Sequence, residues 1–99
     1  MPDPHSTFFK ALSSRSRTRL LHFLAESEEL SVDELTQLVK LAGPTVSRHL
    51  QVLRMLDLVK VRVDAQNRFY SLNEEQLLRK LGAFLEYLGI QTQIAAEEQ

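Results

Sequence analysis

The sequence predicts a mainly α domain with one small β-hairpin, made of five helices and two strands. Two observations lead to this prediction. Apolar residues recur at helical spacing as far as residue 57 and again from residue 74, but between residues 58 and 72 they alternate with polar ones. With 99 residues the chain is long enough for one hydrophobic core and too short for two, so we expect a single domain over residues 1–99.

The chain contains no cysteine, which excludes disulfide bonds, thiolate metal sites and cysteine nucleophiles. No paired-carboxylate, Ser-His-Asp or glycine-rich phosphate-binding pattern is present either. We therefore expect a protein that is not an enzyme and that uses no cofactor. The first residues lack the basic start and apolar stretch of a signal peptide, which predicts a cytoplasmic protein without membrane contact.

The charge is close to balanced overall but unevenly distributed. The net charge is −1, yet residues 40–72 carry six bases against Asp57 and Asp64, and residues 26–34 carry five acids and no base. Such alternation is compatible with an ordinary solvated surface. It is also compatible with a basic binding surface for nucleic acid, because binding depends on where the charge lies and not on the total.

Serine residues mark the starts of the first three predicted helices. Ser6 is expected to cap a first helix over residues 6–13, and Ser14 the next. Ser31 and Glu34 have the spacing of a capping box, in which each side chain bonds the other's backbone N–H.

A short break separates the third and fourth predicted helices. Residues 41–43 form the link, and Pro44 suits the first turn of a new helix. Two short helices with so tight a link predict a helix-turn-helix over residues 31–56.

The fourth helix has one apolar and one polar face. The apolar face contains Val46, Leu50, Leu53 and Leu56, with His49 beside it. The opposite face contains Pro44, Ser47, Arg48, Gln51 and Met55. Small, polar and basic side chains suit phosphates and base edges in the major groove of DNA, which has room for a helix. His49 is expected to be packed and hydrogen-bonded rather than to read a base.

Residues 58–72 predict a hairpin with one buried face and one basic face. Asn67 is expected to supply the left-handed backbone conformation that such turns often need. Lys60, Arg62 and Arg68 would line the hairpin and contact phosphates. A hairpin of this kind after a helix-turn-helix is a wing, so the whole pattern predicts a winged helix-turn-helix.

The last predicted helix covers residues 74–95, and Asn73 is its expected cap. Leu77, Leu81, Phe84 and Leu88 step along it by four, three and four residues, as in a coiled-coil seam. A small domain has little core left to cover this seam. We therefore expect a homodimer in which residues 6–13 and 74–95 form the interface.

From about Phe8 to Leu88 the chain resembles the ArsR/SmtB family of winged-helix repressors. The most specific segment is residues 45–54, Thr-Val-Ser-Arg-His-Leu-Gln-Val-Leu-Arg, which is similar to the family's recognition-helix motif. Residues 14–17 and 68–72 resemble the start of the family's second helix and the strand that leaves its wing. The resemblance implies a homodimer that binds imperfect palindromes in promoters and is released by an inducer.

The sequence departs from the family at its familiar metal sites. Ser31 and Asp33 stand where metalloid-sensing members carry Cys-x-Cys, and oxygen ligands do not replace a thiolate pair. The positions that bind zinc on the last helix of other members hold Glu74, Gln76, Tyr87 and Ile90. We therefore expect a repressor whose inducer is not a cysteine-bound metal.

These arguments give two sets of site residues. The expected DNA contacts are Pro44, Thr45, Ser47, Arg48, Gln51, Lys60, Arg62 and Arg68. The expected dimer contacts are Phe8, Phe9, Leu12, Leu77, Leu81, Phe84 and Leu88. Arg15, Arg17 and Arg19 are expected to pair with the acids of residues 26–34, although flanking phosphates are a second option.

Three alternatives stay open at the level of sequence. His5 and His22, with Asp3 and Glu97-Glu98, would form a zinc or nickel site across a dimer. The aromatic residues would instead wall an apolar effector pocket between the first and last helices. The near-neutral charge and the leucine seam also fit a protein-interaction module on the same scaffold.

Overall fold

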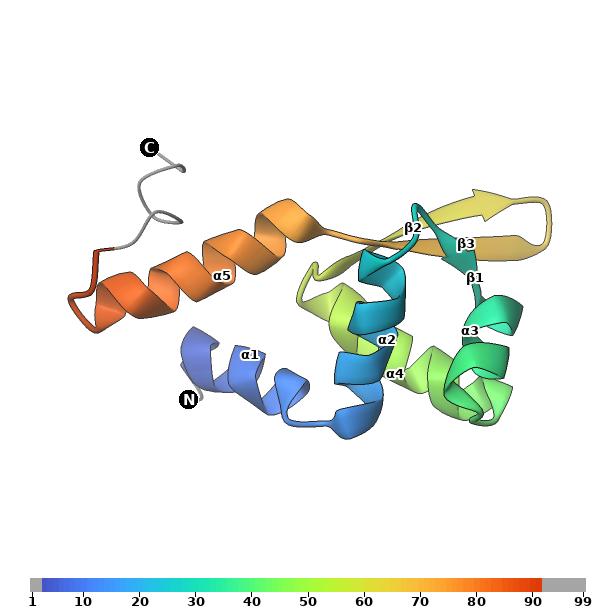
Figure 1. Ribbon diagram of the computed structural model, residues 1–99, viewed down its shortest axis with the longest axis horizontal. Helices are drawn as coiled ribbons and strands as arrows, with labels where there is room; N and C mark the ends of the chain where they lie inside the picture. Colours follow the sequence, from blue (N-terminus) through green and yellow to red (C-terminus); the bar gives the residue numbers. More distant parts are fainter. Residues whose placement is uncertain (1–2, 92–99) are drawn as a thin grey trace.

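The computed structural model describes residues 3–91 and contains five helices and three strands within that range (Figure 1). A winged helix-turn-helix is confirmed. Within these residues no helix is long and apolar enough to cross a membrane. In chain order the elements are α1 (Pro4–Leu12), α2 (Arg15–Ala25), β1 (Leu30–Ser31), α3 (Val32–Val39), α4 (Gly43–Met55), β2 (Val59–Asp64), β3 (Asn67–Leu72) and α5 (Glu74–Tyr87).

Side-chain caps start four of the five helices, mostly as predicted. The Oγ of Ser14 accepts from the Arg17 backbone N–H, and Ser31 and Glu34 form the full capping box. The expectation that Ser6 caps α1 is wrong, because Asp3 accepts from the Ser6 N–H at 2.8 Å and from its hydroxyl at 2.9 Å. Since Pro4 occupies the first helical position, the capping position falls on Asp3.

The sheet has three antiparallel strands in the order β1-β3-β2, so the predicted two-stranded wing of β2 and β3 is extended by a third strand that the sequence did not predict. The short β1 pairs Leu30 with Tyr70 and joins the wing to the start of α3. Asp64 pairs with Asn67 across a two-residue turn, in which Ala65 adopts a left-handed φ of 57°. The left-handed residue is therefore Ala65 and not Asn67.

The hydrophobic core lies between α2, α3, α4 and the inner face of the sheet. Its completely buried members include Leu20, Leu35, Leu50 and Leu58, one from each of three helices and one from the turn before β2. Burying these side chains fixes α4 at the surface of the domain, with its opposite face outward.

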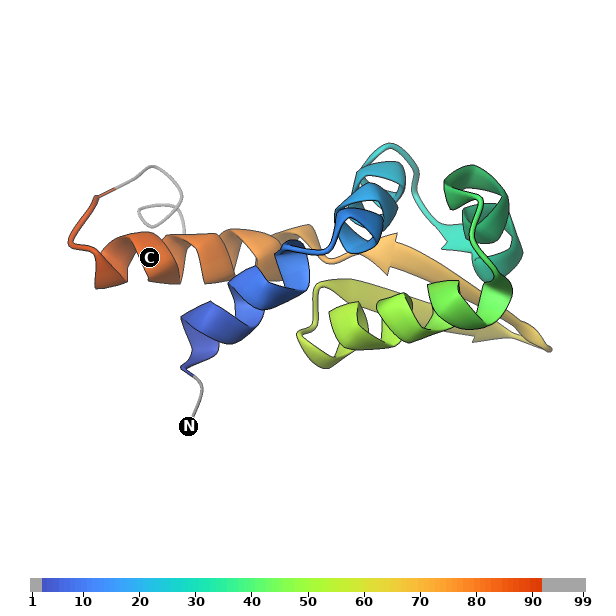
Figure 2. The ribbon, with the colours of Figure 1, turned by 90° about the horizontal axis from the view of Figure 1, so that it is seen from below.

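Helix α5 extends away from this core, with α1 lying beside its length (Figures 1 and 2). Asn73 caps it as predicted. The helix ends at Tyr87, so the expected helical range 74–95 is too long, and residues 92–95 lie outside the described residues. The stop is local, because Gly89 has a φ of 78° and the Ile90 N–H bonds back to the Leu85 carbonyl at 2.9 Å.

Candidate nucleic-acid interface

The turn between α3 and α4 holds the outward helix in place. Lys40 ends α3 in a left-handed conformation with a φ of 58°, and three residues later α4 begins at Gly43. The Nη1 group of Arg19 donates to the Val39 carbonyl at 3.3 Å and so bonds the end of α3 to α2. Val46, Leu50 and Leu53 then anchor α4 in the core.

The residues expected to contact DNA from α4 lie on its outer side. Pro44, Ser47, Arg48 and Gln51 are exposed, and Thr45 is half-buried. No side chain caps this helix, since its capping position is Ala42. Backbone N–H groups in its first turn therefore keep their capacity to donate to an anion.

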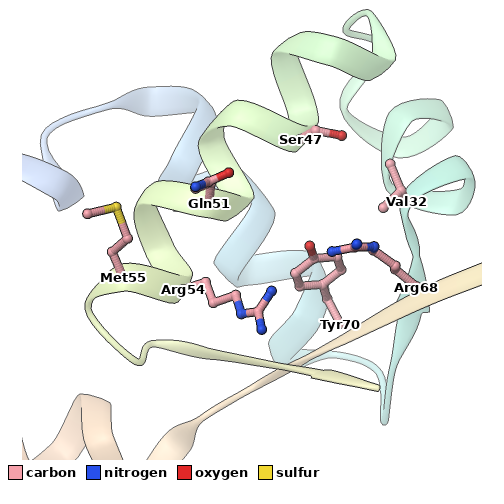
Figure 3. Close-up of a pocket in the computed structure, with 7 residues that line it drawn as sticks. All are labelled: Val32, Ser47, Gln51, Arg54, Met55, Arg68 and Tyr70. Atoms are coloured by element: carbon pink, nitrogen blue, oxygen red, sulfur yellow. The ribbon is translucent and has the colours of Figure 1, made fainter. Parts of the chain in front are cut away.

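A groove with a volume of about 640 Å³ runs between α4 and the sheet (Figure 3). Arg54 of α4 and Arg68 of β3 extend into it from opposite walls, toward Tyr70. Ser47 and Gln51 line the same groove. Sequence reasoning did not select Arg54, although Ser47, Gln51 and Arg54 follow one another at steps of four and three residues, which places all three on one helical stripe.

The three bases of the wing are divided between the two faces of the hairpin. Arg68 pairs with Val63 and Lys60 with Ser71 in the observed register. Side chains alternate between the faces of a strand, so Arg68 shares the Val59–Val61–Val63 face that turns toward α4, and Lys60 and Arg62 lie on the other. The expected basic face is therefore formed by Lys60 and Arg62, and Arg68 lies on the opposite face because of its register with Val63.

Arg62 is held by neighbours on its own face. Its guanidinium forms a two-point ion pair with Glu29, with Nε 3.2 Å from Oε2, and lies 4.5 Å above the centre of the Phe69 ring. The hydrogen bonds from Arg62 lower the pKa of the Glu29 carboxyl, and the same pair raises the pKa of Arg62. This pair connects the wing to the loop before β1, so Arg62 has a structural role that the sequence did not indicate.

His49 is half-buried and lies next to Arg17, as expected for a packed histidine. The Arg17 Nη1 is 3.2 Å from Nδ1 of His49, and its Nε donates to the Ala11 carbonyl at 2.7 Å. Burial, followed by the charges of Arg17 and Arg48, lowers the pKa of His49. Arg17 and Arg19 thus bond backbone carbonyls and a histidine, and their expected pairing with the acids of residues 26–34 is wrong.

The expected dimer contacts fall into two groups. Phe8 is buried in the core, and Leu12, Leu77 and Leu81 pack against it, so these four side chains hold α1 and α5 to their own domain. The remaining three lie further out. Phe9 and Phe84 pack edge-to-face at 4.6 Å, and 53% of Leu88 is exposed. Tyr87 and Ile90, which are 73% and 46% exposed, extend the same apolar end of the molecule.

The two histidines considered as metal ligands have other neighbours. The His5 ring stacks on Tyr87 with 4.9 Å between centres, and His22 pairs with Glu26 at 3.1 Å. Within residues 3–91 no group of three or more potential ligands is close enough to hold a metal ion. Glu97 and Glu98 lie outside the described residues.

A cavity of about 320 Å³ does lie between α1 and α5, where an aromatic effector pocket was considered. Its lining includes His5, Gln76, Arg79 and Lys80, and Phe8 is its one aromatic carbocycle. The cavity is therefore more polar than the sequence suggested.

Comparison with known proteins identifies the chain. Residues 14–61 match the family described as "Bacterial regulatory protein, arsR family". The nodulation protein NolR of Rhizobium meliloti is 34% identical over 91 residues, which cover 92% of this chain and 74% of that protein. The chain belongs to the ArsR family. This places it among transcriptional regulators and not among enzymes.

Other ArsR-family relatives agree in fold and differ in length. The regulator KmtR of Mycobacterium tuberculosis is 41% identical over 69 residues, and the chain spans about half of it, 52%. The crystal structure of NolR from Sinorhizobium fredii superposes with a TM-score of 0.68 at 34% identity, covering 87% of this chain and 85% of that one. HlyU from Vibrio cholerae gives a TM-score of 0.65 at 35% identity, covering 76% and 83%.

Proposed function

We propose that this ArsR-family chain is a sequence-specific repressor that binds a palindromic operator as a homodimer. Among the relatives, a Synechocystis protein that is 39% identical over 71 residues is named a transcriptional repressor. The groove between α4 and the sheet is the observation that carries the proposal. It brings Arg54 and Arg68 together with Ser47 and Gln51 of the exposed polar face of α4.

Each part of this surface suits one component of DNA. Arg48 and Gln51 extend from the exposed face of α4 and have the donors and acceptors needed to read base edges in the major groove. Arg54 and Arg68 lie on the two walls of the groove and suit a phosphate strand that passes between the helix and the wing. No acidic side chain lines this groove among the described residues.

The homodimer is supported by the apolar end formed by Phe9, Tyr87, Leu88 and Ile90. These side chains are exposed on a helix pair that projects from the core. A second copy related by a twofold axis would cover them and present two α4 helices to two half-sites of an operator.

The inducer is proposed to be something other than a cysteine-bound metal. One relative, 35% identical over 80 residues, is named a cadmium resistance regulator, but this chain has no cysteine. The structure also gives Ser31 another use, since its Oγ accepts from the Glu34 N–H at 3.1 Å and caps α3. The position of the family's thiolate ligand is therefore occupied by a helix cap.

The proposal is tested by fluorescence anisotropy with a labelled duplex from the region upstream of the chain's own coding sequence. Tight binding that falls steeply with salt, with much weaker binding to a shuffled duplex, is the expected result. Equal affinity for both duplexes would argue against sequence-specific recognition. No binding at low salt would favour a protein-interaction module on the same fold.

A further inference from the structure

An apolar cavity lies on the other side of α4, where α1 and α2 meet the C-terminal end of that helix. Its volume is about 420 Å³, within the range of small-molecule sites. Ala11 of α1 and Val52, Met55 and Leu56 at the end of α4 supply its apolar lining. The cavity therefore has the size and the walls to hold a small apolar body.

The charged side chains that line this cavity are both positive. Lys10 and Arg17 line it together with the hydroxyl-bearing Thr7, and no acid is among its lining residues in the described chain. A guanidinium has five N–H groups, and three bonds occupy Arg17: to the Ala11 and Lys10 carbonyls and to His49. Arg17 thus has donors left for an anion at the rim, beside the ammonium of Lys10.

We propose that this cavity binds a small carboxylate with an apolar body, whose carboxylate is held by Lys10 and Arg17. The apolar part would lie against Val52 and Leu56, where it replaces water at an apolar wall. The two cations would supply charge-assisted hydrogen bonds that fix the orientation of the ligand. This site is separate from the polar cavity between α1 and α5.

The position of Arg17 gives the ligand a route to the DNA-binding surface. Its guanidinium bonds α1 through the Ala11 carbonyl at 2.7 Å and α4 through His49 at 3.2 Å. A carboxylate bound to the remaining donors of Arg17 draws the same guanidinium toward the cavity and so alters the link between the two helices. This regulatory step rests on the proposed function, whereas binding of the carboxylate does not.

Octanoate is a suitable probe, with octanol as its uncharged counterpart. In a two-dimensional ¹⁵N–¹H titration of the full chain, octanoate should shift the amide signals of Ala11, Val52 and Leu56. Lys10→Ala should weaken octanoate binding about tenfold, because one charge-assisted contact is lost. Val52→Phe, which fills the cavity, should weaken octanoate and octanol alike.

Lys80→Ala is the matched control, because Lys80 is the corresponding lysine of the α1–α5 cavity. It should leave octanoate binding unchanged. The site proposal is overturned if Lys80→Ala and not Lys10→Ala weakens binding, or if octanol binds as tightly as octanoate. The site proposal is also overturned if octanoate does not shift the amide signals of Ala11 and Leu56. This holds whether the cavity is empty or a second copy of the chain fills it.

The regulatory step has a separate readout. At saturating octanoate the operator Kd of the wild type should rise about tenfold, within the usual range of coupling between two sites, and that of Lys10→Ala should change much less. If octanoate binds but does not change operator affinity, the proposed coupling to DNA binding is overturned and the proposed carboxylate site is not. If octanoate binds but no duplex does, the proposed function fails and the carboxylate site does not.

Discussion

Arg17 Nη1 lies 3.2 Å from Nδ1 of His49 and connects the start of α2 to the middle of α4. Arginine is always a donor, so Nδ1 of His49 accepts and the imidazole is neutral with its proton on Nε2. The same guanidinium bonds the last turn of α1. One side chain thus joins three helices, including the two that the proposals assign to dimer formation and to DNA binding.

The neutral state of His49 predicts a pH-dependent stability. The pKa of His49 is lower in the folded chain than its ordinary value of 6.5, because of burial and the charges of Arg17 and Arg48. Unfolding therefore takes up a proton as the pH falls. This contribution to the free energy of unfolding is complete above pH 6.5 and is lost as the pH falls through the lower, folded pKa. In urea titrations, the free energy of unfolding of His49→Gln should therefore fall less below pH 6.5 than that of the wild type.

His22→Gln is the control for this measurement, since His22 is exposed and pairs only with Glu26 within the described residues. The free energy of unfolding of His22→Gln should still show the loss below pH 6.5 that His49 causes. An unchanged slope in His49→Gln would mean that the Arg17 contact does not hold the imidazole neutral.

Substitutions on α4 should separate base reading from general attraction. If Arg48 reads a guanine, Arg48→Ala should lose about 1–3 kcal/mol of operator affinity and relax specificity at one position. Arg48→Ala combined with Gln51→Ala should lose most discrimination between the operator and a shuffled duplex. Unchanged operator binding by the double variant, measured by anisotropy, would contradict the assignment of α4 as the reading helix.

The two faces of the wing should behave differently in salt titrations. Arg68→Ala should reduce the slope of log Kd against log salt by about one, because one phosphate contact is lost. Arg62→Ala should leave that slope unchanged, since its guanidinium is paired with Glu29 on the opposite face. Equal losses of slope in both variants would show that DNA reaches both faces of the hairpin.

The apolar end of α5 should decide the oligomeric state. Leu88→Glu places a charge on a side chain that is 53% exposed in the single chain, so it should fold normally and shift the mass in solution from dimer to monomer. Val63→Glu, at a wing side chain that is 61% exposed, is the matched control and should remain dimeric. Light scattering after size-exclusion chromatography measures both. A dimeric Leu88→Glu would place the interface elsewhere.

The sequence predicted those features that depend on nearby residues. The capping box of Ser31 and Glu34, the cap at Asn73 and the exposed face of α4 all follow from spacing along one helix, and all are confirmed. Asp3 and Ser6 show the limit of such reasoning. Both are good caps three residues apart, and the choice followed from the position of Pro4.

Features that depend on distant residues were missed. Strand β1 is two residues long and exists because Leu30 meets Tyr70, forty positions along the chain. The side of the wing on which Arg68 lies depends on the register with β2, and a shift by one residue would reverse it. The contact of Arg17 with His49 joins positions that no local pattern relates.

The pairing of β1 with β3 has a mechanical consequence. It ties the wing to Ser31, the residue that caps α3, and Arg62 ties the same hairpin to Glu29. In the proposed complex each protomer would therefore present α4 and the wing to the duplex with the spacing between them fixed before contact. An inducer has little freedom to change the shape of this DNA-binding surface. We expect it to change the distance and angle between the two DNA-binding surfaces of a dimer instead.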